Sequence, residues 1–587
     1  MPSILPIISF HTLEFALNHT RTIALSLFLV HFAGSHTQAM VDDEFSPPAS
    51  YYSGATGTGT TLKSQLTSAM SAGHIQRAYG DFRNSASVSD RDPNNPSRII
   101  LVYNLASVNA TWDSGSTWNR EHVWPQSRQP GSASNSTRGN LGDPHALRPC
   151  NPSINSSRGN KPFGTSAASG NFGSLGTFYF PGDTDKGDIS RSLFYSATRY
   201  ASSGLSLVNG VPSGNQMGDL SAHMAWHYLD TPSTFERRRN HYIWSTTLNP
   251  GFRTNNRNAF VDHPEFAWSV YMDQFNDTTL WFGDLEPADG ESTIDLNLNA
   301  LVGDSIAPMD FVLHKGGNDG TYYTVTASTG LGTSHTDCYY AFSMFPNLAE
   351  NVSLTIDSSV TSVAGAFAGD LRVDNLDVTT QGGAGNGASD IDDIIFVNID
   401  VFNPGNGSFA DASDANTLAI DLGTIQNGSG AGTQAFSLFN NAIGGSFGAP
   451  IDIELLSSSG NTAELSTDFS VVSSMLADGS ASFEASLDDS ADGTFSATYT
   501  FRVHNDQSMF ASPTMVEDLI LTLSGVVESG AGCLADINGD GSLDFFDVSA
   551  FLGLFSAGDM AADLNGDGSL DFFDVSAFLG AYSAGCP

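Results

Sequence analysis

Basic residues are scarce in this chain of 587 residues, and nearly all of them lie in its first half. Residues 40–287 contain 19 Lys and Arg against 21 Asp and Glu, whereas residues 288–587 contain 3 against 41. So acidic a segment repels a polyanion, which excludes the second half as a nucleic-acid-binding surface. Any phosphate-binding site must therefore lie in the nearly neutral first half, on local clusters of arginine.

Cysteine is also rare, and the sparse spacing of Cys150, Cys338, Cys533 and Cys586 excludes a disulfide scaffold for the large domains. Cys533 and Cys586 bracket the last segment, and we expect a disulfide between them that stabilises this segment by about 4 kcal/mol. Cys150 is expected to be a buried thiol. It falls in a different predicted domain from Cys338, so we predict no bond between these two.

Long hydrophobic runs are missing except near the N-terminus. After Arg21 comes a largely apolar run of twelve residues, Ile23–Gly34. This run is too short to span a bilayer, and small residues follow it, as is typical of a secretory signal peptide. We therefore expect residues 1–39 to be a signal peptide, the protein to be secreted or associated with the cell surface, and no transmembrane segment elsewhere.

The residues that can carry chemistry gather in one stretch, Asn119–Asn160. Phosphodiester hydrolysis needs a base for the attacking water and a cation that neutralises the phosphate. Glu121 and His122 are adjacent in a predicted strand, so their side chains point to opposite faces unless a strand end or bulge brings them to a common centre. Asn155, in a segment expected to open a helix, supplies a neutral oxygen that suits a hard cation such as Mg²⁺.

Three motifs in this stretch resemble the endonuclease I family of non-specific nucleases, which use the ββα-metal, or His-Me finger, motif. The pattern R-E-H-V-x-P occupies residues 120–125, and D-x-H-x-L-x-P occupies residues 143–149. The third motif consists of Asn155, Arg158, Asn160 and Phe163. Further matching segments follow in order, so the resemblance covers roughly residues 50–270.

The resemblance implies a role for each motif residue. His122 is implied as general base, with Glu121 and Asn155 as ligands of one Mg²⁺ or similar divalent ion. Arg158 and His145 are further catalytic candidates. The remaining motif residues are implied to hold the ββα element together or to touch phosphate: Arg120, Asp143 and Asn160.

Two of these roles have structural alternatives. His145 could hold the ββα element together without a part in catalysis. Arg158 could cap a helix or pair with Asp143 instead of contacting phosphate.

The chain departs from the family pattern at two places. The family often has an asparagine after the second histidine, where this chain has Ala146. Some members also carry a phosphate-clamping arginine on a Cys-rich insertion, but the corresponding segment here, Gln126–Leu141, is short and has no cysteine. Arg128, Arg138 or another arginine would have to take over that contact.

The fold expected from these patterns is multidomain. A mixed α+β nuclease domain is expected over residues 48–287. From residue 290 apolar and polar residues alternate between turn signals, which predicts two all-β sandwiches over residues 290–405 and 406–529, related by a weak internal repeat. Their role is open between a spacer or adhesive module and carbohydrate binding.

The last segment, residues 533–587, contains the pattern D-x-N-x-D-G-x-x-D-x-x-D twice, at an offset of 27 residues. Oxygen atoms at this spacing suit Ca²⁺, and the glycine permits the sharp turn. The predicted ligands of the first ion are Asp536, Asn538, Asp540, the Ser542 carbonyl, Asp544 and Asp547. Those of the second ion are Asp563, Asn565, Asp567, the Ser569 carbonyl, Asp571 and Asp574.

These paired loops, with aspartate at the twelfth position, resemble a dockerin. The resemblance implies a small α-helical domain that folds around two Ca²⁺ and docks to a cohesin-like or surface-anchoring module.

The sequence therefore predicts a secreted, Mg²⁺-dependent, non-specific endonuclease that hydrolyses DNA, with RNA as a second candidate substrate. Two other classes stay open. One is an inactive nuclease-like protein of surface adhesion, and the other is a dockerin-bearing polysaccharide-degrading enzyme. Against the latter, no paired carboxylates are found on facing strands of a barrel or sandwich.

Overall fold

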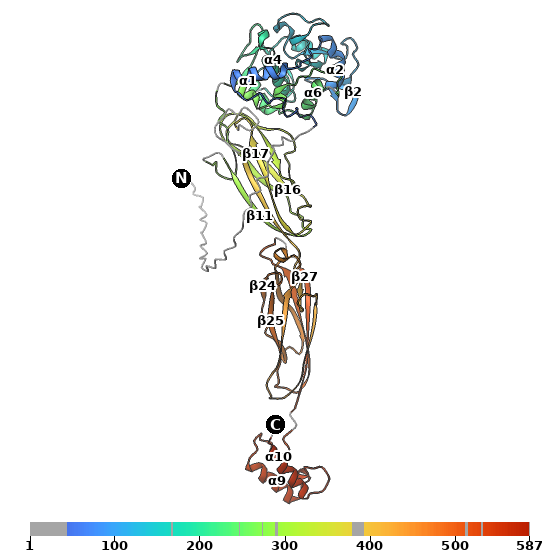
Figure 1. The fold of residues 1–587 in the computed structure, drawn as a ribbon, viewed down its shortest axis with the longest axis vertical. Coiled ribbons are helices and arrows are strands. Elements are labelled where there is room, and N and C mark those ends of the chain that lie inside the picture. Colours follow the sequence, from blue (N-terminus) through green and yellow to red (C-terminus); the bar gives the residue numbers. More distant parts are fainter. Residues whose placement is uncertain are drawn as a thin grey trace, which may run out of the picture.

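The computed structural model describes residues 44–165, 168–245, 247–272, 274–287, 291–378, 392–510, 515–529 and 532–585. Figure 1 shows an elongated molecule in which a rounded α+β region comes first, two β-rich bodies follow and a small helical pair comes last. The predicted signal peptide, residues 1–39, lies outside the described residues. Within the described part of the chain, no helix has both the length and the apolar character needed to cross a membrane.

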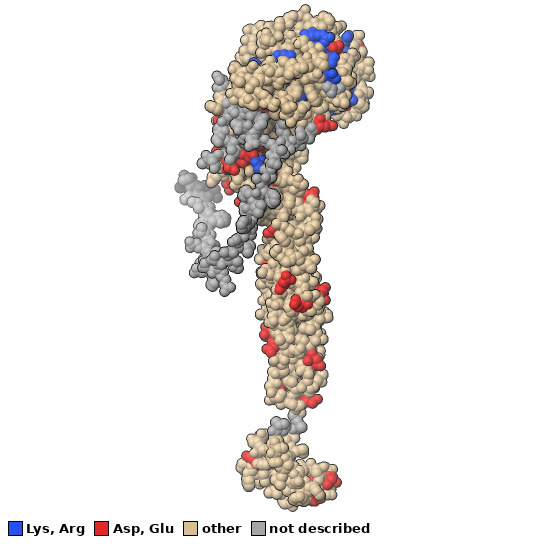
Figure 2. All heavy atoms as spheres, viewed as in Figure 1, with Lys and Arg blue, Asp and Glu red and all other residues tan. Residues whose placement is uncertain are grey.

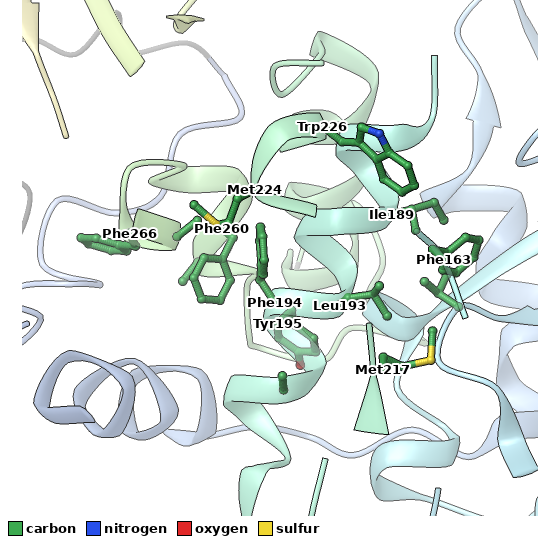
Figure 3. Packing of buried hydrophobic residues seen from close by; sticks show 14 of the residues in the cluster. Phe163, Ile189, Leu193, Phe194, Tyr195, Met217, Met224, Trp226, Phe260 and Phe266 are labelled. Carbon is green, nitrogen blue, oxygen red and sulfur yellow. The ribbon is translucent and has the colours of Figure 1, made fainter. Parts of the chain in front are cut away.

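The α+β region is organised around α4 (Lys186–Arg199), which is buried along nearly its whole length. Its apolar side chains, among them Leu193 and Phe194, pack in one cluster with Trp226 and Phe260 from later helices (Figure 3). The rings of Phe194 and Phe260 lie 5.6 Å apart. Burying a side chain of this size contributes about 1.5–3 kcal/mol, so this cluster holds α4 at the centre of the region.

The other helices of this region surround α4, and its strands are short. The helices are α1 (Gly59–Ser71), α2 (Phe82–Ser89), α3 (Pro152–Arg158), α5 (Leu220–Leu229), α6 (Thr234–Trp244), α7 (Ala259–Asp262) and α8 (Phe266–Tyr271). The strands are β1 (Arg91–Asp92), β2 (Asn95–Ile100), β3 (Ser107–Asn109), β4 (Asn119–His122), β5 (Leu147–Cys150), β6 (Gly173–Leu175), β7 (Phe178–Phe180), β8 (Ser206–Leu207) and β9 (Gln216–Met217).

A hairpin and a helix form the ββα element: β4 pairs antiparallel with β5, and α3 follows β5 directly. The Asn151 side chain accepts hydrogen bonds from the backbone N–H groups of Ser153 and Ile154, and Pro152 occupies the first helical position. Both features favour a helix start, because the cap satisfies N–H groups that have no partner within the helix. The helix ends at Gly159, whose φ of 58° favours a residue without a side chain.

Buried ion pairs fix this element to the helices behind it. Arg148 of β5 pairs with Asp188 of α4 at 3.0 Å, and Arg239 of α6 pairs with Asp90 at 2.7 Å. Arg239 also donates to the Leu147 carbonyl of β5. Removing one partner of a buried pair costs about 3–5 kcal/mol, because a charge is left without compensation. Strand β5 is therefore firmly anchored to α4 and α6.

The two β-rich bodies have the same topology. Their four-stranded sheets run β10-β12-β16-β14 and β19-β21-β25-β23, and their five-stranded sheets run β11-β18-β17-β13-β15 and β20-β27-β26-β22-β24. In each body one apolar core contains residues of both sheets. The repeated strand order matches the weak internal repeat of the sequence.

The strands of the first body are β10 (Leu280–Phe282), β11 (Thr293–Leu301), β12 (Met309–Lys315), β13 (Thr321–Ala327), β14 (Leu331–Thr333), β15 (Tyr340–Phe342), β16 (Leu348–Ile356), β17 (Gly365–Asn375) and β18 (Asp393–Phe402). Those of the second body are β19 (Gly407–Ser408), β20 (Thr417–Gln426), β21 (Gly432–Asn440), β22 (Ile451–Gly460), β23 (Leu465–Thr467), β24 (Val472–Met475), β25 (Ser480–Leu487), β26 (Gly493–Asn505) and β27 (Met515–Glu528).

The first β-rich body begins earlier than residue 290, where the sequence pattern placed its start. β10 falls within the span predicted for the nuclease domain, yet it pairs with β12. Leu280 and Phe282 belong to the apolar core of the β-rich body. Two alternating apolar residues are too few to be recognised as a strand from sequence.

The C-terminal pair of helices repeats in structure as it does in sequence. The elements are α9 (Phe545–Ala557), the 3-10 turn η7 (Met560–Ala562) and α10 (Phe572–Ala584). Asp544 and Asp571 cap the two helices in the same way, and Phe551 stacks on Phe578 with ring centroids 4.2 Å apart. Cys533 is disulfide-bonded. Its predicted partner, Cys586, lies outside the described residues.

Candidate active site

A polar pocket of about 590 Å³ opens beside the ββα element. Its walls come from β4, the turn after β4, the end of α3 and the segment before α2. The lining residues are Tyr79, Asn119, Arg120, Glu121, His122, Pro125, Gln126, Ser127, Gln129, Gly131, Asn155, Arg158, Gly159 and Asn160. Glu121, His122 and Asn155 thus reach one space, since β4 ends at His122 and the chain turns there.

The tautomer of His122 follows from its hydrogen bond. Nε2 lies 3.0 Å from the carbonyl oxygen of Leu141. A carbonyl oxygen only accepts, so Nε2 carries the proton and Nδ1 keeps the lone pair. Burial lowers the pKa of His122 to about 4, so the imidazole is neutral at ordinary pH and can accept a proton.

Glu121 is a buried carboxylate with one oxygen engaged. Oε1 accepts hydrogen bonds from the Tyr103 hydroxyl at 2.7 Å and from Arg158 Nη1 at 3.0 Å. Burial raises the pKa of Glu121, and the positive charge of Arg158 opposes that rise. Among the described residues nothing donates a hydrogen bond to Oε2, which leaves this oxygen available on the pocket wall.

Asn155 presents a second available oxygen. Its Nδ2 donates to the side-chain oxygen of Asn119 at 2.8 Å, which orients the carboxamide. No described residue donates a hydrogen bond to Asn155 Oδ1. A carboxylate oxygen and a carboxamide oxygen are the type of ligands that Mg²⁺ takes, so this donor set fits a hard divalent cation completed by water and substrate.

Arg158 is among the residues that line the pocket, but it is held by contacts within the protein. Its side chain is fully buried and packs over the Phe163 ring at 4.4 Å. Besides its ion pair with Glu121, it donates to the backbone carbonyls of His122 and Val123. Arg158 therefore fixes the end of β4, and the alternative pairing with Asp143 is wrong.

His145 and Asp143 are not among the residues that line the pocket. His145 is buried, with Nε2 3.1 Å from the Asn256 carbonyl. Asp143 accepts hydrogen bonds from the hydroxyls of Tyr195 and Tyr200 and from the backbone N–H of His145. This placement favours the structural alternative for His145, which holds the turn before β5.

The remaining motif residues lie on the pocket wall. Asn160 donates to the Ser127 hydroxyl at 3.3 Å, and Arg120 extends from β4. Sequence patterns did not point to Tyr79 or Tyr103. Tyr79 stacks on the His122 ring, and the Tyr103 hydroxyl donates to Glu121. No local signal marks these two tyrosines, because they reach the site only through the tertiary fold.

The C-terminal loops repeat the same hydrogen bonds. Asp536 accepts from the backbone N–H groups of Asp540 and Gly541, and Asp563 accepts from those of the equivalent Asp567 and Gly568. No three His, Cys, Asp or Glu side chains of the described chain are arranged as a metal site. The calcium assignment therefore depends on the ligand pattern of the sequence.

A neutral histidine beside two side-chain oxygens without hydrogen-bond donors, on a ββα element, is an arrangement suited to a hydrolytic nuclease. The family model described as Endonuclease I matches residues 58–265. The extracellular ribonuclease of Bacillus amyloliquefaciens is 36% identical over 242 residues, which cover 38% of this chain and 78% of that protein. The extracellular ribonuclease of Bacillus subtilis (strain 168) is 37% identical over 235 residues, with the same coverage of 38% and 78%. The chain belongs to the endonuclease I family.

Solved structures resemble the chain only weakly. The adhesive subunit CfaE of the CFA/I fimbria of enterotoxigenic Escherichia coli is 9% identical and covers 42% of this chain and 100% of its own length, with a TM-score of 0.21. No assignment follows from a likeness of this size.

Proposed function

We propose that this nuclease is a secreted, Mg²⁺-dependent endonuclease that cleaves DNA and RNA without strong sequence preference. One observation carries the proposal: His122 Nδ1, Glu121 Oε2 and Asn155 Oδ1 all lack a hydrogen-bond partner among the described residues and belong to residues of one pocket. The relatives described as extracellular ribonucleases support secretion and add RNA to the substrates.

Glu121 and Asn155 would hold the divalent ion. When bound, that ion neutralises charge on the phosphate and stabilises the leaving oxygen. His122 accepts the proton of the attacking water at Nδ1. The bond from Nε2 to the Leu141 carbonyl fixes the ring and stabilises the imidazolium that forms. Arg158 favours the ionised form of Glu121.

The charge distribution suits a polyanionic substrate only at the N-terminal region. Figure 2 shows Lys and Arg gathered over the rounded region, while on the visible face of the rest the charged residues are mainly Asp and Glu, scattered among uncharged ones. Binding should therefore depend on a few phosphate contacts and weaken with salt. The acidic remainder of the chain repels the polyanionic substrate, which favours its approach to the N-terminal region.

The deciding experiment compares plasmid DNA, RNA and a polysaccharide as substrates of the full chain, with Mg²⁺ and with EDTA. We expect both nucleic acids to be cleaved only with Mg²⁺. His122→Ala should lower the rate by about 10²- to 10⁴-fold, because the general base is lost. His314→Ala, on the first β-rich body, is the matched control and should cleave like the wild type. Unchanged cleavage by His122→Ala would refute the mechanism.

We further propose that residues 533–587 form a dockerin-like domain that binds two Ca²⁺, is closed by a Cys533–Cys586 disulfide and attaches the enzyme to a cohesin-like or cell-surface module. The supporting observations are the exact repeat of the ligand pattern and the matching loop hydrogen bonds. In this arrangement the β-rich bodies separate the nuclease from its point of attachment.

A further inference from the structure

The pocket contains an aromatic contact that the catalytic roles leave unexplained. The Tyr79 ring stacks on the His122 imidazole, with centroids 4.8 Å apart and planes at 24°. The guanidinium of Arg120 lies over the same Tyr79 ring, 3.7 Å from its centroid. Tyr79 comes from the segment before α2, so a residue distant in sequence contacts both the base and an arginine of the pocket.

The hydrogen bonds of Arg120 use only one side of its guanidinium. Nη1 donates to the Tyr79 carbonyl at 2.9 Å and to the Asn135 side chain at 3.4 Å. Nε is buried and has no acceptor, and Nη2 has none among the described residues. An unsatisfied buried donor is costly, which is why nearly all such groups have a partner in folded proteins.

The unused side is the one that binds oxyanions elsewhere in this chain. Arg191, Arg257 and Arg502 each direct Nε and Nη2 together at one carboxylate, with donor–acceptor distances between 2.5 and 3.3 Å. This parallel pair of N–H groups matches the spacing of two oxygens on a carboxylate or a phosphate. Arg120 presents the same pair of donors without an internal acceptor.

The other arginines considered for phosphate contact are less well placed. Arg158 is fully buried, and both of its terminal nitrogens are engaged. Arg128 donates to the backbone carbonyls of Asn160 and Pro212 and does not line the pocket. Arg138 is exposed, bonds the Gln76 carbonyl and also does not line the pocket.

We propose that Arg120 binds a phosphate of the nucleic-acid strand through Nε and Nη2, and that Tyr79 is the positioning residue that holds this guanidinium and the His122 imidazole in fixed relation. The inference deepens the proposed nuclease function and rests on it. The cation–π contact holds the guanidinium of Arg120 against the Tyr79 ring, at the wall of the pocket.

The test measures cleavage kinetics and oligonucleotide affinity for the full chain at several salt concentrations. Arg120→Gln should weaken binding about 10- to 100-fold, the loss expected for a charge-assisted pair of hydrogen bonds. The slope of log affinity against log salt should fall by about 1, since one phosphate contact disappears. Arg120→Lys should restore the slope but not the full affinity, because lysine keeps the charge without the paired donors.

Tyr79 is tested by a pair of variants. Tyr79→Phe keeps the ring and should match the wild type in kcat and KM. Tyr79→Leu removes it and should raise KM and lower kcat together, because both contacts are released. Arg138→Gln is the matched control, with binding and salt slope close to the wild type.

The outcomes separate this inference from the proposed function. A wild-type protein that cleaves no nucleic acid with Mg²⁺ overturns both. A cleaving wild type whose Arg120→Gln variant keeps its affinity and salt slope overturns the phosphate contact alone. A Tyr79→Phe variant as impaired as Tyr79→Leu overturns the positioning role, and Arg120→Gln still decides the phosphate contact if Tyr79→Leu fails to fold.

Discussion

At the scale of single residues, a substitution of Asn155 tests metal binding with little effect on folding. Its side chain is half-buried and bonds Asn119 through Nδ2. Alanine at this position removes one oxygen ligand and one modest hydrogen bond. We expect the free energy of unfolding to fall by about 1 kcal/mol or less, while the Mg²⁺ concentration for half-maximal cleavage rises about 10-fold or more. Asn155→Asp keeps an oxygen ligand and should retain more activity.

The matched control is Asn151→Ala, four residues earlier, at the residue that precedes the same helix. It removes the N-terminal cap of α3 and should cost about 1 kcal/mol of stability. Its requirement for Mg²⁺ should stay near that of the wild type. A Mg²⁺ titration of Asn155→Ala that superimposes on the wild type would remove this residue from the ligand set.

The sequence places some site residues well because they are close along the chain. Glu121 and His122 are adjacent at a strand end, and Asn155 follows the second strand of the same element, so local patterns bring all three together. Tyr79 and Tyr103 could not be found in this way. They approach from separate segments, and only the packing of the whole region aligns their rings with the site.

At the scale of elements, the turn η4 (Pro144–Ala146) gives the region a pH dependence. Burial lowers the pKa of His145 in this turn to about 4, against an ordinary value of 6.5. The folded pKa lies below the unfolded one, so the stabilising contribution is fully present above pH 6.5 and is lost as the pH falls toward 4. The shift corresponds to a contribution on the order of 3 kcal/mol.

Denaturant unfolding of the wild type and of His145→Asn, at pH values from 7 to 4, checks this contribution. Asparagine should destabilise the protein at pH 7, because the packing is altered. The variant should lose less stability than the wild type between pH 6.5 and 4, because it has no imidazole to protonate. Equal losses in the two proteins would show that His145 does not contribute to the acid sensitivity.

A second prediction at the scale of elements concerns the helical pair at the C-terminus and its response to Ca²⁺. Carboxylates at this density repel one another unless a cation is bound, so residues 533–585 of the full chain should resist proteolysis with Ca²⁺ and be cleaved with EGTA. Asp547→Ala and Asp574→Ala should each weaken the protection, since each removes the buried aspartate of one loop. A digestion pattern that does not respond to Ca²⁺ would count against the dockerin-like assignment.

At the scale of the molecule, the alternation of apolar and polar residues predicts two β-rich bodies. It does not predict how the first body contacts the nuclease region. The apolar cluster around α4 includes Tyr322, Tyr339 and Leu376 of the first β-rich body. Local alternation identifies strands but does not say which surface of a body is covered. The contact depends on single residues, Tyr322 in β13 and Tyr339 and Leu376 outside the strands, which carry no periodic signal.

This shared core predicts that the nuclease depends on its neighbour. Tyr228 of α5 donates to Asp377 at 2.8 Å, and burial raises the pKa of Asp377 well above its usual value. Tyr322 donates to the His227 carbonyl. A chain that ends at residue 287 would expose this face, so we expect its melting temperature and nuclease half-life to fall clearly. A chain that ends at residue 405 keeps the contact and should melt like the full protein in its nuclease transition.

A point variant tests the same junction without truncation. Tyr228→Phe removes the hydroxyl and leaves the buried Asp377 without that donor, which should cost about 1–3 kcal/mol. Tyr340→Phe is the control and should leave the nuclease transition unchanged, because the Tyr340 ring packs on Tyr323 and His335 of the β-rich body and its hydroxyl accepts from the Asp337 N–H of that body. If the chain ending at residue 287 melts at the same temperature as the full chain, the β-rich body is a spacer that merely touches the enzyme. If it melts lower, the body is part of the enzyme's fold, and the stability of the pocket depends on a region from which none of its described lining residues comes.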